Sequence, residues 1–66
     1  MSKVYGTTEL GRKMLRGGEG LSPDEKKVLQ YIRDNKAVTD DALSVVGDRW
    51  TIRKLKDMQL IKELHP

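Results

Sequence analysis

Apolar side chains recur at helical spacing along most of this chain, and the first such stretch covers residues 7–16. There Leu10 and Met14 stand four residues apart, and Leu15 widens the apolar side, which predicts a helix with these side chains toward the core. Gly11 lies in the middle of this helix. It either weakens the helix by about 1 kcal/mol relative to alanine or permits the close approach of another backbone segment.

Residues 17–20, GGEG, predict a flexible connector, which we favour over an RNA-binding arginine-glycine tract because the motif is not repeated. The helix after it carries the clearest local signal. Ser22 as N-cap, Pro23 at the first helical position and Glu25 three residues after the cap form a capping box. Asn35 is expected to end this helix in a left-handed conformation. Its core side is predicted to consist of Val28, Leu29 and Ile32.

Residues 39–61 predict two short helices joined by a tight turn at Gly47-Asp48. Thr39 is the expected N-cap of the first helix, with Asp40 and Asp41 in its first turn. There the helix dipole favours negative charge, so we interpret these carboxylates as capping groups rather than metal ligands. Asp48 is expected to cap the second helix. The side chains assigned to the core are Ala42, Leu43, Val45 and Val46 from the first helix and Thr51, Ile52, Leu55 and Met58 from the second.

The two ends of the sequence favour β-structure. Val4 and Tyr5 lie in a short segment, residues 3–5, that Gly6 punctuates, and the segment LIKEL at residues 60–64 alternates apolar and polar side chains. The last strand would otherwise keep a bare edge, so we expect the two segments to pair in antiparallel fashion. The predicted order is strand, four helices, strand.

The chain has 66 residues, which predicts one small domain, residues 1–66, made of an N-terminal part (1–20) and a main part (22–64). It contains no cysteine and a single histidine, His65, so disulfides and zinc-finger sites are excluded. No catalytic pairing or phosphate-binding glycine loop is visible, and we expect neither an enzyme nor a cofactor, metal or small-molecule substrate. No apolar run would span a bilayer, and no signal peptide is visible, so a cytoplasmic protein is expected.

The distribution of charge narrows the class of partner. The net charge is +3, and nine of the 13 basic side chains lie in residues 1–20 and 49–66, whereas residues 37–48 hold only acidic ones. If the two ends meet in the fold, their basic side chains form one positive surface that suits nucleic acid. The alternative is an ordinary solvated surface of mixed charge.

The second helix of the hairpin, residues 48–58, is basic on the side opposite its apolar face. Arg53 lies near the middle of that side, with Arg49, Trp50 and Asp57 around it, and Lys54 and Lys56 lie on its flanks. Lysine and arginine neutralise phosphates, and arginine also hydrogen-bonds to guanine in the major groove. Asp57 opposes DNA binding locally and is expected to pair with Arg53 or Lys54.

Trp50, the only tryptophan, allows three interpretations. It packs under the turn or against the N-terminal helix, or it contacts a sugar–phosphate edge or a thymine methyl group, or it anchors a protein interface, where tryptophan is enriched.

The segments SPDEKKVLQYI, TDDALSVVG and TIRKLKDMQLI give the chain a resemblance to the winged-helix domains of bacterial and archaeal transcription regulators, over residues 22–64. The resemblance implies a three-helix core with a small sheet, here with an extra N-terminal helix, and a third helix that reads DNA. That role falls on Arg49, Trp50, Arg53, Lys54 and Lys56. The turn before Thr51 is about one residue short, and the hairpin that forms the usual wing is missing after Leu64. The segment VYGTTELGRKML resembles the one that normally follows the wing.

The sequence therefore predicts a mainly α-helical, winged-helix-like protein that inserts residues 48–58 into the major groove of double-stranded DNA, as a transcriptional regulator or accessory factor. Its predicted DNA-binding residues are Arg49, Trp50, Arg53, Lys54 and Lys56, with Arg12, Lys13 and Arg16 from the N-terminal helix. A lone small domain binds weakly unless it dimerises on two half-sites, so a homodimer or protein partner is a further expectation. The alternative function is a protein-interaction module anchored by Trp50.

Overall fold

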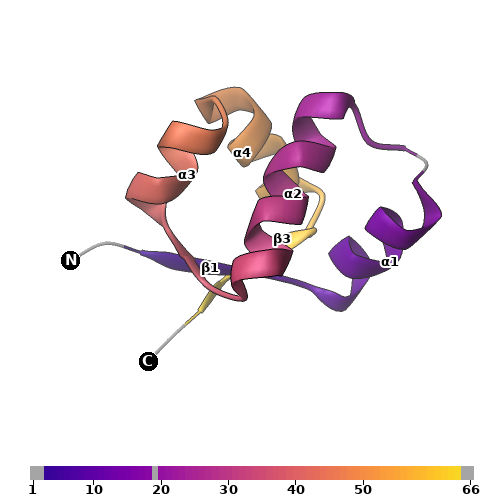
Figure 1. The fold of residues 1–66 in the computed structure, drawn as a ribbon, viewed down its shortest axis with the longest axis horizontal. Coiled ribbons are helices and arrows are strands. Elements are labelled where there is room, and N and C mark those ends of the chain that lie inside the picture. Colours follow the sequence, from indigo (N-terminus) through magenta and orange to yellow (C-terminus); the bar gives the residue numbers. More distant parts are fainter. Residues whose placement is uncertain (1–2, 19, 65–66) are drawn as a thin grey trace.

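Segments from near both ends of the chain meet in one antiparallel sheet, around which four helices are arranged (Figure 1). The computed structural model describes residues 3–18 and 20–64, so Glu19 of the connector and His65 lie outside the described ranges. In chain order the elements are β1 (Val4–Thr7), α1 (Glu9–Gly17), α2 (Pro23–Asn35), β2 (Val38–Thr39), α3 (Asp40–Val46), α4 (Arg49–Asp57) and β3 (Ile61–Leu64). The protein is thus mainly helical with a small sheet, as the sequence predicts.

The predicted pairing of the terminal strands is confirmed. β1 lies between β2 and β3, and its register with β3 pairs Val4 with Leu64 and Thr7 with Ile61. The strand runs through Gly6, contrary to the prediction that Gly6 would end it. A Cβ atom on Gly6 would lie 3.0 Å from a methyl carbon of Leu64 and 3.2 Å from the Lys36 carbonyl oxygen, so this glycine lets neighbouring groups approach the strand closely.

Strand β2 was not predicted. Its two residues, Val38 and Thr39, pair with Tyr5 and Val4 of β1. A strand of two residues shows no alternation of apolar and polar side chains, so periodicity cannot find it. Thr39 is also the N-cap of α3, as predicted, and β2 therefore leads directly into that helix.

Helix α2 is the centre of the core and packs against β1 and all three other helices. The burial of its predicted face, Val28, Leu29 and Ile32, is confirmed. The core consists of Tyr5, Leu15, Val28, Leu29, Ile32, Val38, Leu43, Ile52, Leu55, Leu60 and Ile61. Every helix contributes to this cluster, so α4 is held from behind by Ile52 and Leu55 while its polar side faces outward.

Helix α1 is rotated relative to the prediction. Gly11 and Leu15 are its buried residues, whereas Leu10 is exposed. A Cβ atom on Gly11 would lie 2.2 Å from the carbonyl oxygen of Leu60, so the glycine is required by a close backbone approach, the second of its two interpretations. Thr8, the N-cap, donates its hydroxyl proton to the Gln59 carbonyl oxygen at 2.7 Å and fixes the start of α1 beside the chain that enters β3.

The predicted helix caps are present. The Ser22–Glu25 capping box starts α2, and the side chains of Thr39 and Asp48 accept hydrogen bonds from the backbone N–H groups of Ala42 and Thr51. At the other end of α2 the prediction is wrong by one residue. The residue with positive φ is Lys36 rather than Asn35, and its φ of 65° and ψ of −46° lie outside the left-handed helical region.

Two apolar side chains near the turn between α3 and α4 are exposed. Val45, predicted to lie in the core, is 87% exposed, and Trp50 is 77% exposed. The two-residue turn at Gly47-Asp48 is confirmed, but α3 has only seven residues and buries only Leu43 fully. A helix of only two turns presents a narrow row of side chains to α2, and Val45 lies outside that row.

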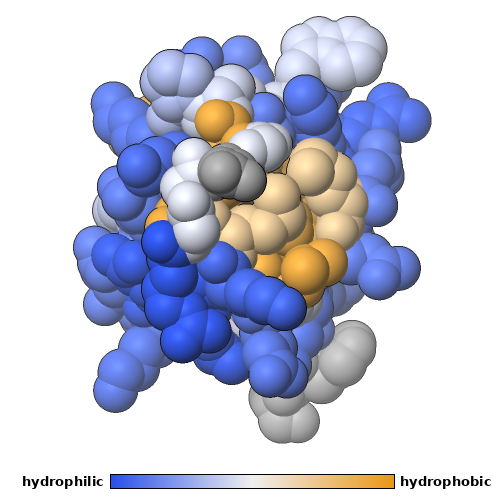
Figure 2. All heavy atoms as spheres, turned by 90° about the vertical axis from the view of Figure 1, so that its right-hand side faces the viewer, coloured by the Kyte–Doolittle hydropathy of each residue, from blue (hydrophilic) through white to orange (hydrophobic). Residues whose placement is uncertain are grey.

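On the side of the molecule formed by α1 and the connector, apolar side chains gather in one patch surrounded by hydrophilic groups (Figure 2). Met14 of α1 and Leu21, which directly follows the connector, pack against the core and stay partly exposed. Within residues 3–18 and 20–64, no helix has the length and apolar character needed to cross a membrane.

Candidate functional site

Helix α4 is flanked by two open hollows, and each is lined by charged side chains. The α3–α4 groove, of about 560 Å³, is lined by Asp40, Ser44, Gly47, Asp48, Arg49, Ile52, Arg53 and Lys56. The α2–α4 groove, of about 630 Å³, is lined by Ser22, Asp24, Glu25, Trp50, Thr51, Arg53, Lys54 and Asp57. Only Arg53 lines both grooves.

The α3–α4 groove gathers three of the predicted DNA-binding side chains. Arg49, Arg53 and Lys56 are all exposed and lie on successive turns of α4. Neither arginine forms an ion pair with a described residue. Both therefore keep their guanidinium groups available to an outside acceptor.

One of the two carboxylates in this groove has a structural role. An Asp48 carboxylate oxygen accepts a hydrogen bond from the Thr51 backbone N–H at 2.7 Å, and this bond lowers the pKa of Asp48. The carboxylate is held at the N-terminus of α4, where the positive end of the helix dipole favours it. Asp48 thus fixes the start of the helix that carries the arginines.

Lys56 is directed toward the sheet. Its ammonium nitrogen lies 4.5 Å from the centre of the Tyr5 ring in β1, a cation–π arrangement. Tyr5 is buried, so its ring offers a fixed surface on which the lysine rests. This contact places the positive charge where α4 meets the sheet.

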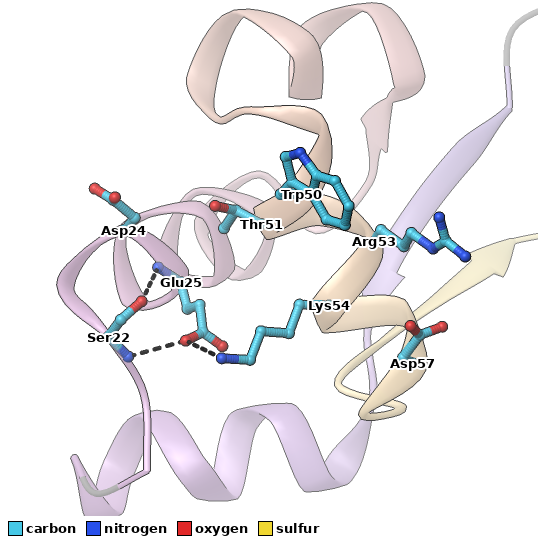
Figure 3. A pocket seen from close by; sticks show the side chains of 8 residues that line it. All are labelled: Ser22, Asp24, Glu25, Trp50, Thr51, Arg53, Lys54 and Asp57. Carbon is cyan, nitrogen blue, oxygen red and sulfur yellow. Dashed lines mark hydrogen bonds and ion pairs between the residues drawn. The ribbon is translucent and has the colours of Figure 1, made fainter.

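The α2–α4 groove is organised around Glu25 (Figure 3). One carboxylate oxygen, Oε1, accepts the Ser22 backbone N–H at 3.2 Å and lies 3.5 Å from the ammonium nitrogen of Lys54. Lys54 and Glu25 point toward one another from α4 and α2. This cross-helix ion pair, and not the predicted pairing with Asp57, is the interaction that Lys54 makes.

Glu25 is the only charged residue among those buried in the described part of the chain, and its two oxygens differ. The whole residue is only 4% exposed, yet its second oxygen, Oε2, is buried without a hydrogen-bond partner. Burial raises the pKa of Glu25, but the hydrogen bonds with Ser22 and the charge of Lys54 outweigh burial and lower it. Glu25 is therefore a carboxylate of which one oxygen, Oε2, accepts no hydrogen bond.

Trp50 stands on the rim of the α2–α4 groove. Its exposure of 77% shows that the interpretation of Trp50 as a core residue is wrong. The Arg53 side chain extends away from Glu25 in Figure 3, and Asp57 lies one turn further along α4. The walls of the groove thus combine an exposed indole with carboxylates from two helices.

The structure separates the eight predicted site residues into three places. Arg49 and Lys56 line the α3–α4 groove, Trp50 and Lys54 line the α2–α4 groove, and Arg53 lines both. The three basic side chains of α1, namely Arg12, Lys13 and Arg16, are exposed and line neither groove. Helix α1 packs mainly against α2 and β1.

Glu25 is the site residue that the sequence analysis missed. The capping-box pattern predicts its bond to Ser22, and that bond is present, but the pattern says nothing about the second oxygen. The spacing of apolar residues does place Glu25 on the buried side of α2. Glu25 precedes Val28, Leu29 and Ile32 by three, four and seven residues, which puts all four on one face of the helix.

Comparison of the chain with protein-family models, with curated proteins and with solved structures gave no match.

Proposed function

We propose that this protein binds double-stranded DNA, with α4 lying in the major groove and the α3–α4 groove facing the phosphate backbone. The observation that carries the proposal is the gathering of Arg49, Arg53 and Lys56 on one exposed side of α4. Cationic side chains on one helix face neutralise successive phosphates, and the N-terminal half of such a helix reaches base edges. Arg49 and Arg53, in that half, are the proposed base contacts.

The architecture supports this proposal. Helices α2, α3 and α4 with a small sheet agree with what the winged-helix resemblance implies, and β1 supplies a strand from the segment that resembles the one after the wing. The apolar side of α4 is fixed by Ile52 and Leu55 in the core. A helix held in this way presents its arginines without reorganisation, which lowers the entropic cost of binding.

The test is a titration of the protein with short duplex DNA at 50 mM salt, comparing the wild type with the double variant Arg49→Ala, Arg53→Ala. At about 1.4 kcal/mol for each arginine, the double variant should bind about 100-fold more weakly. Circular dichroism should show an unchanged fold, because both side chains are exposed.

The matched control removes the same charge from α2 through Lys26→Ala and Lys27→Ala, at two exposed positions outside the α3–α4 groove. This control should retain most of the affinity. Equal losses in the two double variants would mean that net charge, and not the α4 surface, attracts DNA. Absence of binding by the wild type at 50 mM salt would reject the proposal.

A second candidate function is protein interaction anchored by Trp50. The observation that favours it is the exposure of Trp50 beside a groove that Arg49 and Lys56 do not line. Large exposed aromatic side chains are typical centres of protein interfaces.

A further inference from the structure

Two features of the α2–α4 groove are not used by DNA binding. The first is Glu25 Oε2, an acceptor that is buried and has no partner. Leaving such an atom without a hydrogen bond is unfavourable, and more so when the group is charged. The second is Trp50, whose indole is mostly exposed on the rim of the same groove. Both features call for a ligand group that is a hydrogen-bond donor and stacks on an aromatic ring.

The charges of the groove determine the sign of that ligand. Asp24, Glu25 and Asp57 line it, against Arg53 and Lys54. Lys54 is already paired with Glu25 Oε1, and Arg53 extends away from Glu25 (Figure 3). Asp24 and Asp57 form no ion pair with a described residue. The groove therefore favours a cation and disfavours a phosphate.

Among cationic side chains, arginine fits both features. Its planar guanidinium stacks on an indole face and carries five N–H donors in a fixed fork, enough to serve a buried oxygen and a second carboxylate together. Oε2 is closed to solvent in the free protein, so a guanidinium reaches it only when the side chains around it shift. The Lys54 side chain, paired with Oε1, is 63% exposed and has room to move aside as a second cation approaches Glu25. A lysine ligand would offer a point charge without the stacking plane.

A neighbouring hollow extends this surface. It is lined in part by Asp24, Val45 and Thr51, and it shares Asp24 and Thr51 with the α2–α4 groove. Val45 is almost fully exposed there. An extended peptide would thus meet an acidic, aromatic groove and then an apolar side chain, which suits a protein segment rather than an isolated small cation.

We propose that the α2–α4 groove binds an arginine side chain from a segment of a partner protein, with the guanidinium stacked on Trp50 and donating to Glu25 Oε2. This inference rests on the second candidate function, protein interaction anchored by Trp50, and is separate from DNA binding, which uses the neighbouring α3–α4 groove. The two proposals share only Arg53 among the lining residues.

The experiment uses the full ¹⁵N-labelled chain and the peptide acetyl-Gly-Arg-Arg-Gly-amide. A matched peptide with citrulline in place of arginine keeps the shape and removes the charge. Because Trp50 is the only tryptophan, the single indole N–H signal reports on the groove alone. The arginine peptide should shift this signal and the backbone signals near Glu25 and Lys54 in a saturable way, and the citrulline peptide should not.

Three variants locate the contact. Trp50→Ala and Glu25→Gln should each weaken binding of the arginine peptide at least tenfold. Because Trp50→Ala has no indole signal, its binding is measured on the backbone signals. Asp40→Asn, a change in the other groove, should leave binding unchanged. If Glu25→Gln does not fold, Asp57→Asn takes its place as the charge-removing change, because Asp57 is exposed. Arg49→Ala should weaken only DNA binding, so failure of one proposal is distinguishable from failure of the other.

Several results would overturn the inference. They are an unmoved indole signal, equal binding of the citrulline peptide, and undiminished binding by Glu25→Gln or, where that variant does not fold, by Asp57→Asn. A fourth is an indole shift that depends on protein concentration without peptide, because a second copy of this chain would then occupy the groove. A fifth is an indole signal that moves only when duplex DNA is added.

Discussion

The two grooves beside α4 are built from the same helix and present opposite charges. The α3–α4 groove holds three cations and two carboxylates, of which Asp48 is used as a cap. The α2–α4 groove holds three carboxylates and two cations, of which Lys54 is used by Glu25. The charge of a surface beside a helix is thus set by the neighbouring elements together with the helix's own side chains. In isolation α4 is basic; α2 makes one of its sides acidic.

Salt dependence should separate the two grooves by the largest margin. If Arg49, Arg53 and Lys56 each displace one condensed counterion on entering the DNA, affinity falls about 40-fold between 50 and 200 mM salt. Removal of one of these contacts by Lys56→Ala should reduce the fall to about 12-fold. Fluorescence anisotropy with a labelled duplex measures both values. Binding of a single arginine in the α2–α4 groove should change much less, because no condensed counterions are released.

The same salt titration tests whether helix α1 contacts DNA. The triple variant Arg12→Ala, Lys13→Ala, Arg16→Ala removes three exposed charges that line neither groove. We expect the slope of its log DNA affinity against log salt concentration to match that of the wild type. A shallower slope would add α1 to the DNA surface and break the assignment of DNA binding to the α3–α4 groove alone.

Glu25→Ala should produce the largest change in stability. It removes the hydrogen bond to Ser22, the ion pair to Lys54 and buried side-chain contacts, so the free energy of unfolding at pH 7 should fall by about 1–3 kcal/mol. Asp24→Ala, at the neighbouring exposed position, is the control. Urea unfolding measures both variants. Equal effects would contradict a special role for the buried carboxylate.

The Glu25 contribution should also depend on pH. Because its pKa in the folded protein lies below the ordinary 4.5, its contribution to stability is fully present above pH 4.5 and is lost as the pH falls through the folded pKa. Wild type and Glu25→Gln should therefore converge in stability in acid. Parallel stability curves from pH 7 down into that range would contradict the lowered pKa.

The smallest expected effects distinguish Lys54 from Lys56. Lys54→Ala should cost about 0.2–1 kcal/mol of stability, since its ammonium group is largely exposed. Lys56→Ala loses a cation–π contact with Tyr5 and should cost about 0.5–1 kcal/mol. Only Lys56→Ala should also weaken DNA binding. If Lys54→Ala weakens DNA binding equally, the two sides of α4 act as one surface.

Local signals predicted much of this fold. The Ser22–Glu25 capping box, the Thr39 and Asp48 caps and the turn at Gly47-Asp48 each depend on residues adjacent in sequence, and each is present. The pairing of β1 with β3 was also predicted, from the bare edge that the last strand would otherwise keep.

The errors arose where tertiary packing decides. Leu10 and Val45 have apolar side chains at plausible core positions, but Gly11 must face the Leu60 carbonyl. In α3, Leu43 is the fully buried residue, and Ala42 and Val46 pack partly buried against the core. Similarly, a helix projection placed Lys54 and Lys56 as equivalent flanks. The structure sends one toward Glu25 and the other toward Tyr5, because different elements lie on the two sides of α4.

The central position of β1 has a consequence for how the protein is made. Synthesis on the ribosome begins at the N-terminus, so residues 4–7 emerge long before their partners, residues 38–39 and 61–64. The helices have mostly local hydrogen bonds and are able to form in the meantime, whereas the sheet closes only after Leu64 has left the exit tunnel. β1 has two bare edges until residues 38–39 emerge and one until β3 emerges, so a nascent chain that stalls before Ile61 exposes a strand edge that can pair with another chain.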